Sequence, residues 1–395
     1  MTTPKVLMVG WELPPYNSGG LGEACYGLAK ALSEKGIEIV FVLPQKVDLD
    51  IDFMKLEFAN IKMDKKKLEN FYAASSIFGK SFRKLSELPG NYIKAAIVYA
   101  ERIGDIVEKY NPDIIHAHDW LTYPAGIVAK ELSGRPMIAH VHSTELDRTG
   151  GNNPNKEVYE IEKEGLIVAD RVLPVGGFMK KIITERYGIN PEKIKVIYNG
   201  INSRNVRMLP PALTSFKNMG YKIVLFLGRI TLQKGPEYFV RAASIVLKHK
   251  PKTIFVVTGS GDMQEYMMNE TARLGLTDNF IYTGFLRGQE RDMVFQAADL
   301  YVMPSVSEPF GITALEAAAN NTPALISKQS GVSEIFQHSL KVDFWDIDEM
   351  ASKIIACLKY KALGVDLRRE SKKEVANLTW SKSADKVLEV YRELV

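Results

Sequence analysis

Two glutamates stand eight positions apart where a strand gives way to a helix in the second half of the chain. Glu308 precedes Gly311, which disfavours helix, and Glu316 lies in the alanine-rich run that follows. The first amide groups of a helix lack partners within it and favour an anion. A phosphate at residues 311–313 would have one carboxylate on each side to accept hydrogen bonds from sugar hydroxyls. The spacing predicts a sugar-phosphate site, but an acidic loop before a helix with an N-terminal glutamate would look the same.

A pair of cations, Arg229 and Lys234, follows the apolar strand predicted at residues 223–227. Ligands of open α/β sheets bind at the carboxyl ends of strands, and two cations there can neutralise a diphosphate without a metal ion. Gly235 lets the chain turn close to such a ligand, and Pro236 suits the first turn of the next helix. Two surface cations in an ordinary strand-to-helix loop are the alternative interpretation.

A glycine loop joins the first predicted strand to the first helix. Gly19 and Gly20 would let the backbone approach a ligand closely. The loop is not the G-x-G-x-x-G fingerprint of dinucleotide-binding proteins, and no acidic residue stands out at the end of the next strand. We therefore do not expect NAD as a cofactor.

Four of the six histidines fall at the ends of two predicted strands. His116 and His118 precede Asp119, and His140 and His142 close the other strand. We expect two of them to alternate between the faces of a strand, so that the group forms a polar cluster rather than a metal site. The sequence thus predicts no bound metal ion.

The composition indicates an ordinary globular protein. The net charge of +4 is too small to argue for a nucleic-acid partner, and no apolar run reaches the roughly 18 residues of a membrane span. Two distant cysteines and the absence of a signal-peptide pattern favour a cytoplasmic protein with free thiols. Residues 60–84 mix lysines with aromatic side chains. They predict a solvated helix and loop, or a surface that meets a lipid or an anionic acceptor.

Short apolar segments alternate with helical patterns along the 395 residues, which predicts an α/β fold with two doubly wound, Rossmann-like domains. The series begins at residue 6 and again at residue 223. We expect an N-terminal domain over residues 1–203 and a C-terminal domain over residues 204–379. An amphipathic helix at about 380–395 is expected to pack back on the first domain.

These elements occur in the order found in retaining GT-B glycosyltransferases, and nearly the whole chain resembles the group 1, or family 4, members. The segments around His116 and Gly20 look similar to glycogen and starch synthases. The resemblance implies two Rossmann-like domains facing each other across a cleft. It also implies transfer of a hexose, glucose being expected, from a nucleotide sugar such as UDP-glucose to a carbohydrate hydroxyl, with retention of configuration and without a metal.

The resemblance further implies roles for individual residues. Arg229 and Lys234 would hold the donor diphosphate, Glu308 the donor sugar and Glu316 the ribose. His142 would lie beside the transferred sugar and Asp119 near the acceptor. The remaining donor contacts would come from Gly19, Gly20, Phe285, Leu286, Gly311, Ile312 and Thr313.

One residue departs from the glycogen synthase pattern. Asn17 occupies the place of the lysine in the Lys-x-Gly-Gly-Leu segment typical of the bacterial enzymes. The departure favours a broader family 4 enzyme over α-1,4-glucan elongation. Two alternative interpretations stay open. The chain could be a sugar phosphorylase or a nucleotide-sugar epimerase of the same fold, or it could be a non-catalytic nucleotide-sugar binding protein.

Overall fold

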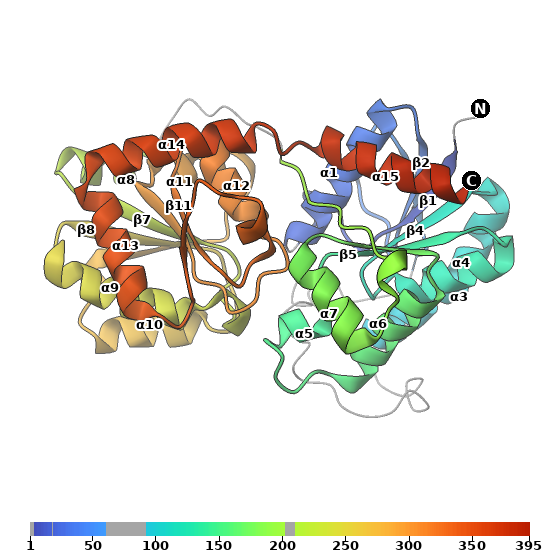
Figure 1. Ribbon diagram of the computed structural model, residues 1–395, viewed down its shortest axis with the longest axis horizontal. Coiled ribbons are helices and arrows are strands. Elements are labelled where there is room, and N and C mark those ends of the chain that lie inside the picture. The colour runs from blue at the N-terminus through green and yellow to red at the C-terminus, as the bar shows by residue number, and fades with distance from the viewer. Residues whose placement is uncertain (1–3, 18, 61–91, 202–209) are drawn as a thin grey trace. The chain divides into compact units, whose positions relative to one another are not determined.

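The computed structural model describes residues 4–17, 19–60, 92–201 and 210–395. The chain divides into two compact units: unit 1 comprises Met1–Gly200 and Trp380–Val395, and unit 2 comprises Ile201–Thr379 (Figure 1). The predicted basic and aromatic segment at 60–84 lies, apart from Asn60, outside the described residues.

Unit 1 is built on a six-stranded parallel sheet with the strand order β3-β2-β1-β4-β5-β6. The strands are β1 (Lys5–Val9), β2 (Glu38–Leu43), β3 (Lys55–Phe58), β4 (Ile114–His118), β5 (Met137–Val141) and β6 (Arg171–Pro174). The helices are α1 (Gly20–Glu34), α3 (Tyr92–Tyr110), α4 (Tyr123–Ser133), α5 (Glu145–Arg148), α6 (Lys156–Val168), α7 (Gly177–Tyr187) and α15 (Trp380–Leu394), with a 3-10 turn at Pro191–Lys193.

Unit 2 repeats this topology. Its six-stranded parallel sheet has the order β12-β11-β10-β7-β8-β9. The strands are β7 (Lys222–Leu227), β8 (Thr253–Thr258), β9 (Phe280–Gly284), β10 (Leu300–Met303), β11 (Ala324–Ser327) and β12 (Leu340–Val342). The helices are α8 (Pro211–Asn218), α9 (Pro236–His249), α10 (Gln264–Arg273), α11 (Gly288–Ala297), α12 (Ile312–Ala319), α13 (Ile347–Lys359) and α14 (Lys361–Val375), with 3-10 turns at Leu232–Lys234, Thr277–Asn279 and Gly331–Glu334.

Counted from its own first strand, each unit has the order 3-2-1-4-5-6 of a Rossmann fold, so the predicted doubly wound α/β class is confirmed. The central strands are mostly apolar because helices cover both faces of such a sheet, and the polar exceptions in β4 are His116 and His118. Residues 6–9 of β1 and all of β8 and β10 are buried. The order reverses between β1 and β4 in unit 1 and between β7 and β10 in unit 2.

The C-terminal helix α15 packs beside α1 on unit 1 (Figure 1). Gly27 of α1 permits this approach, because a Cβ atom there would lie 2.4 Å from the Trp380 ring. Val387 and Val390 of α15 are fully buried, as expected for the apolar stripe of an amphipathic helix.

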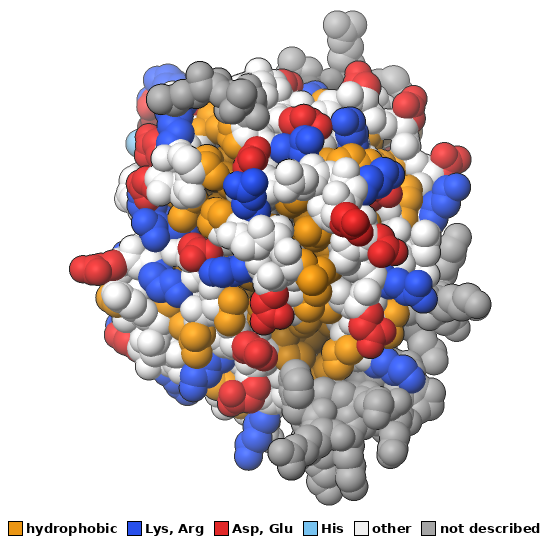
Figure 2. Space-filling model, turned by 90° about the vertical axis from the view of Figure 1, so that its right-hand side faces the viewer, with side chains coloured by type: hydrophobic (Ala, Val, Ile, Leu, Met, Phe, Trp, Pro, Cys, Tyr) orange, Lys and Arg blue, Asp and Glu red, His pale blue; other side chains and the backbone are white. Residues whose placement is uncertain are grey.

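The surface carries mixed charge. On the side of the molecule drawn in Figure 2, lysine and arginine side chains alternate with aspartate and glutamate, with no continuous basic area among the described residues there. Within the described part of the chain, no helix is long and apolar enough to cross a membrane.

Candidate functional site

In each sheet the strand order reverses once, and ligands of open α/β sheets bind at the carboxyl ends of the strands at such a position. In unit 2 the residues after β7 and β10 flank this switch point. In unit 1 the residues after β1 and β4 do so. The residues predicted to bind the donor and to do chemistry fall on these loops, on the loops after β5 and β9, or in the first turns of the helices α1 and α12.

In unit 2 the loop after β7 is locked to the loop after β10. Gly235 adopts a φ of +65°, and a Cβ atom there would lie 2.2 Å from the Pro304 carbonyl oxygen, so only glycine fits. The Val306 amide donates to the Gln233 carbonyl at 2.9 Å. The two loops therefore form one rigid edge that carries Lys234 on one side and Glu308 on the other.

Lys234 and Glu308 form an ion pair across this edge, and the Ser305 hydroxyl donates to the same Glu308 oxygen at 3.2 Å. The Glu308 backbone is held as well, because its amide donates to the Gln329 carbonyl at 3.0 Å and its carbonyl accepts from Gly331 at 2.9 Å. The carboxylate is 8% exposed and the lysine 19%. A half-buried cation thus lies beside a carboxylate at the switch point, where an incoming anion can compete for it.

Arg229 lies on the same loop and is half-buried. Its Nη2 atom donates to the Gln233 side chain at 3.3 Å, on the segment that also carries Lys234. Both predicted diphosphate ligands therefore belong to the short connection between β7 and α9.

The start of α12 follows Glu308 as predicted. Gly311 precedes the helix with a φ of +106°, and a Cβ atom there would lie 2.9 Å from Met303 and 3.0 Å from Val332. Ile312 and Thr313 form the first turn and are half-buried. The Tyr301 hydroxyl, from β10, lies 2.8 Å from the Thr313 hydroxyl and donates to the Leu227 carbonyl at 3.2 Å. Tyr301 thereby ties the helix start to β7.

Glu316 has a partner that we did not predict from the sequence. Arg291 of α11 places its Nη2 atom 2.8 Å from Glu316 Oε1, and both side chains are mostly buried, with exposed fractions of 17% and 14%. The two residues are 25 positions apart in the sequence and lie on neighbouring helices, so no local pattern indicated the pair. Arg291 fixes the carboxylate predicted to contact the ribose.

Phe285 and Leu286 follow β9, which is separated from β7 by β8 in the sheet. The Phe285 side chain is 45% exposed, and the Arg287 guanidinium lies 4.6 Å from its ring centre. The Gly259 amide donates to the Gly284 carbonyl at 2.8 Å, and a Cβ atom at Gly259 would lie 1.9 Å from the Gly228 carbonyl oxygen. The loops after β7, β8 and β9 thus pack on one another by backbone contacts.

In unit 1 the glycines between β1 and the first turn of α1 differ in how closely other atoms surround them. A Cβ atom at Gly19 or Gly20 would meet nothing within 4 Å among the described atoms, so packing does not require glycine there. A Cβ atom at Gly22 would lie 2.6 Å from that of Asn17. The Asn17 side chain donates to the Gly19 carbonyl at 2.8 Å, and the Gly22 amide donates to Glu12 at 3.2 Å. Asn17 therefore braces this loop.

Asp119 holds the backbone of His142. It directly follows β4 with a φ of +63°, and its Oδ1 atom accepts from the His142 amide at 2.6 Å and from the Ser143 amide at 3.3 Å. The side chain is 2% exposed, and burial raises the pKa of the carboxyl to about 7. The structure thus brings Asp119 and His142 together.

The expectation that two of the histidines alternate between faces is wrong. His116 and His118 are two residues apart in β4, so they lie on the same face, and their rings stack at 4.5 Å. His140 and His142 likewise stack at 4.5 Å. The predicted cluster of polar side chains is present, but as two adjoining columns on one face of the sheet.

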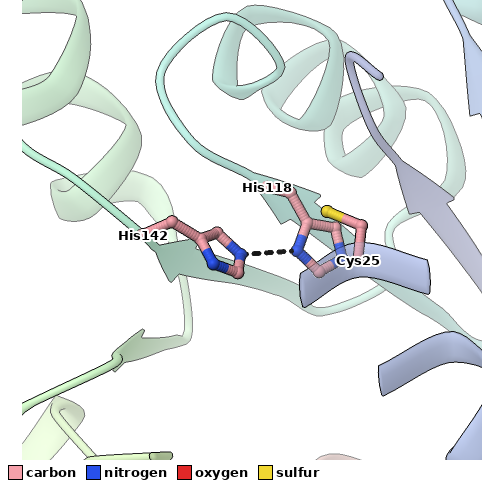
Figure 3. Close-up of side chains that lie close together, drawn as sticks. All are labelled: Cys25, His118 and His142. Atoms are coloured by element: carbon pink, nitrogen blue, oxygen red, sulfur yellow. Dashed lines mark hydrogen bonds between the residues drawn. The ribbon is translucent and has the colours of Figure 1, made fainter. Parts of the chain in front are cut away.

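Hydrogen bonds join the two columns. His116 bonds to the Tyr391 hydroxyl of α15 at 2.7 Å and to His140 at 3.0 Å, and His118 bonds to His142 at 3.1 Å (Figure 3). Burial lowers the pKa of His116 and of His142 to about 3, so both rings are neutral at pH 7. Neutral imidazoles suit contact with an uncharged sugar.

A buried ion network lies behind this loop, and the sequence analysis missed it. Arg148 donates to Glu145 at 3.2 Å, forms a close ion pair with Glu162, and donates to the Ser143 carbonyl at 3.3 Å. These side chains are at most 3% exposed. The short spacing of Glu145 and Arg148 directly after His142 was the available signal.

Comparisons with known proteins identify the family of the chain. The sequence pattern of the glycosyl transferases group 1 matches residues 214–374, and that of glycosyltransferase family 4 matches residues 18–205. An uncharacterized glycosyltransferase of Methanocaldococcus jannaschii is 31% identical over 404 residues, covering 98% of each chain. The glycogen synthase of Mycobacterium tuberculosis H37Rv is 27% identical over 339 residues, covering 84% of this chain and 79% of its own.

A solved structure shares the fold. The Anabaena protein HepE, in complex with UDP-glucose, superimposes with a TM-score of 0.74 at 17% sequence identity, covering 99% of this chain and 100% of its own. The likeness extends over both units, as expected for the GT-B fold.

Proposed function

The chain belongs to the group 1, family 4 glycosyltransferases and is a hexosyltransferase, and from this premise we propose that it is a retaining, metal-independent enzyme. It transfers a hexosyl group from a nucleoside diphosphate sugar to a carbohydrate hydroxyl. The observation that carries the proposal is the Lys234–Glu308 ion pair on the interlocked loops of the unit 2 switch point.

The donor binds to unit 2 in this proposal. Arg229 and Lys234 neutralise the diphosphate, and the amide groups at residues 311–313 add the positive end of the α12 dipole. When Lys234 turns to the diphosphate, Glu308 is released to accept hydrogen bonds from sugar hydroxyls. Glu316, fixed by Arg291, accepts from the ribose. Phe285 and Leu286 lie along the base.

Unit 1 provides the transferred sugar with uncharged partners. His142 contacts that sugar, and Asp119 positions His142 by accepting a hydrogen bond from its backbone amide. The acceptor is expected near Asp119. Gly19 and Gly20 let the backbone approach the donor because no packing contact occupies their Cβ positions among the described residues.

The difficult step is the departure of the nucleoside diphosphate. The bond between the anomeric carbon and the bridging phosphate oxygen breaks, and negative charge grows on that oxygen while the sugar becomes oxocarbenium-like. Preorganised cations and amides directed at the oxygen stabilise this charge. The acceptor oxygen attacks from the same face, and its proton passes to the departing phosphate. Configuration is therefore retained.

The donor base and sugar are identified by a thermal-shift screen with UDP, ADP and GDP sugars, because a ligand that binds the native state raises its stability. UDP-glucose is the first candidate, since it is the ligand in the HepE structure. A donor concentration of 100 times Kd would add about 2.7 kcal/mol to the free energy of unfolding. The donor is then incubated with sugar and glucan acceptors. Release of nucleoside diphosphate with an elongated α-linked acceptor supports the proposal, and a sugar phosphate or an epimer as product refutes it.

Elongation of an α-1,4-glucan is the more specific version, and the glycogen synthase relative favours it. Asn17, in its bracing contact with Gly19, stands where the resemblance leads one to expect a lysine. A glucan acceptor in the same assay separates this version from transfer to a small sugar.

A further inference from the structure

Three side chains of unit 1 converge with the donor atoms that transition metals prefer. Cys25 comes from α1, His118 from the end of β4, and His142 directly follows β5 (Figure 3). One ligand atom from each of the three lies within 4.8 Å of the other two. Thiolate sulfur and imidazole nitrogen are both ligands that zinc binds in proteins.

The spacing of the two imidazoles already matches that of metal ligands. His118 Nδ1 lies 3.1 Å from His142 Nε2. Two nitrogens bound to one tetrahedral zinc ion, each at about 2.0–2.1 Å, are separated by about 3.3 Å. Both atoms can therefore bind one ion after a shift of a few tenths of an ångström, and the Cys25 sulfur needs a rotation or a small movement to join them.

The ring nitrogens of His118 and His142 that take no part in their mutual hydrogen bond are unsatisfied within the described part of the chain. His118 Nε2 and His142 Nδ1 are buried and have no hydrogen-bond partner among the described residues, and the same holds for Asp119 Oδ2. Buried polar atoms are almost always satisfied, and exceptions commonly mark the place of an ion or a water. The ligand nitrogens named above are the other two, His118 Nδ1 and His142 Nε2, so the orphaned nitrogens would carry the ring protons when an ion is bound.

A second trio, His116, His118 and His140, is a weaker candidate. Both ring nitrogens of His116 already have partners, Tyr391 and His140, and all three side chains are fully buried. His142 is half-buried and therefore gives access from solvent. The exposure of one member favours the trio that contains Cys25.

We propose that Cys25, His118 and His142 bind Zn²⁺ or a similar thiolate-preferring divalent ion. On binding, the Cys25 thiol releases one proton and forms the sulfur–metal bond, and the neutral imidazoles give their lone pairs. Three protein ligands leave a fourth position for a water molecule. The ion is not needed for glycosyl transfer. Because it occupies His142, it inhibits transfer, a consequence that depends on the proposed function.

The binding test uses the full chain, Co²⁺ as a spectroscopic probe for the zinc site, and no sugar. We expect a thiolate-to-cobalt charge-transfer band and intense tetrahedral d–d bands, all abolished by equimolar Zn²⁺. The chain has two cysteines, Cys25 and Cys357, and Cys357 belongs to unit 2. The Cys357→Ser variant should keep the bands, and Cys25→Ser should lose the charge-transfer band and bind at least about tenfold more weakly.

Absence of the charge-transfer band in the wild type, or its loss in Cys357→Ser, overturns the site. Persistence of the band in a folded Cys25→Ser variant does the same. If Cys25→Ser does not fold, the Cys357→Ser spectrum still decides, because Cys25 is then the sole cysteine.

The inhibition arm compares transfer rates with Zn²⁺ and with chelator. Wild type should be at least about tenfold slower with saturating Zn²⁺, and Cys25→Ser should show a ratio near one at the same concentration. Equal inhibition of both proteins refutes the inhibitory consequence. A protein that binds Co²⁺ through Cys25 but transfers no sugar would refute the proposed function and leave the metal site standing.

Discussion

The two units share one strand order but furnish their switch points with opposite kinds of chemistry. Unit 2 presents charged pairs, Lys234 with Glu308 and Arg291 with Glu316. Unit 1 presents stacked imidazoles that burial keeps neutral, with the pKa of His142 lowered to about 3. One topology thus supports an edge suited to an anion and an edge suited to an uncharged ligand.

The difference follows from whether each edge can exchange one of its own charged groups for a charged ligand. An ion pair at a partly exposed edge can exchange its carboxylate for a phosphate, so the charges remain compensated before and after binding. The imidazoles of unit 1 have no such exchange, and protonating the buried ones would place uncompensated charge in the interior. Unit 1 keeps its buried charges in a closed network around Arg148, away from the ligand edge.

The largest expected effect concerns that network. Replacing Arg148 by methionine leaves Glu145 and Glu162 without their cation, and breaking a buried ion pair in this way costs about 3–5 kcal/mol of stability. Urea unfolding followed by tryptophan fluorescence measures the loss, because Trp11, Trp120 and Trp380 all belong to unit 1.

Arg369→Met is the matched control. Arg369 forms surface pairs with Asp366 and Glu370 and is 58% exposed, so we expect almost no change in stability. Equal effects of the two substitutions would mean that the buried charges of unit 1 do not stabilise it. This would contradict the contrast drawn between the closed ion network of unit 1 and the exchangeable ion pairs of unit 2.

Next in size is the loss of the unit 2 cation. Lys234→Ala should lower kcat by about 100-fold or more, since removal of one group that stabilises developing charge typically has this effect. Steady-state kinetics with the donor found by thermal shift measures it. Lys222→Ala serves as control, because Lys222 begins β7 and pairs with Asp299 at 3.3 Å at the amino end of the strand. Wild-type turnover in Lys234→Ala would remove the residue from the mechanism.

The titration of Asp119 gives an effect that is modest at any one pH step and accumulates with pH. Its pKa is raised to about 7 in the folded protein, so the folded state binds more protons than the unfolded state between about pH 4 and 7. Stability must therefore fall as pH rises through this window, by roughly 1 kcal/mol per pH unit. His116 and His142, with lowered pKa values, give the opposite slope below about pH 6.5.

The difference between wild type and Asp119→Asn isolates the aspartate. Denaturant unfolding of both proteins at several pH values should show the wild type losing stability relative to the variant as the pH rises. A constant difference would show that Asp119 is ionised throughout, and the neutral character of the unit 1 edge would then need revision.

The smallest expected effect is that of a chelator on transfer. In the proposed function Arg229, Lys234 and the α12 amides compensate the diphosphate, so EDTA should not lower the rate, and it should raise the rate of protein that carries inhibitory zinc. Activity that disappears with EDTA and returns with Mg²⁺ would place a required metal beside the donor.

The fold was predictable because its signal is local. Fully apolar runs such as residues 223–227 and 300–303 are typical of central strands of a covered sheet, and Gly228 marks the turn after the first of them. The loop before α12 was predictable for the same reason, since Gly311 and the alanine run are adjacent in the sequence.

The partners within the site were not predictable, because they are remote in the sequence. Lys234 and Glu308 are 74 residues apart, and Arg291 pairs with Glu316 through the packing of two helices. The histidines show a different failure. Residues two apart in a strand share a face, so the stacking of His116 on His118 followed from the strand period, but the hydrogen bond from His118 to His142 required the pairing of β4 with β5.

The helix α15 has a consequence for how the protein is made. It completes unit 1 after all of unit 2 has been synthesised, and its Tyr391 is the hydrogen-bond partner of His116. Domains generally fold during synthesis in the order in which they emerge from the ribosome. Here the unit that begins first must wait for residues 380–395, so unit 2 can finish folding before the histidine columns have their last contact.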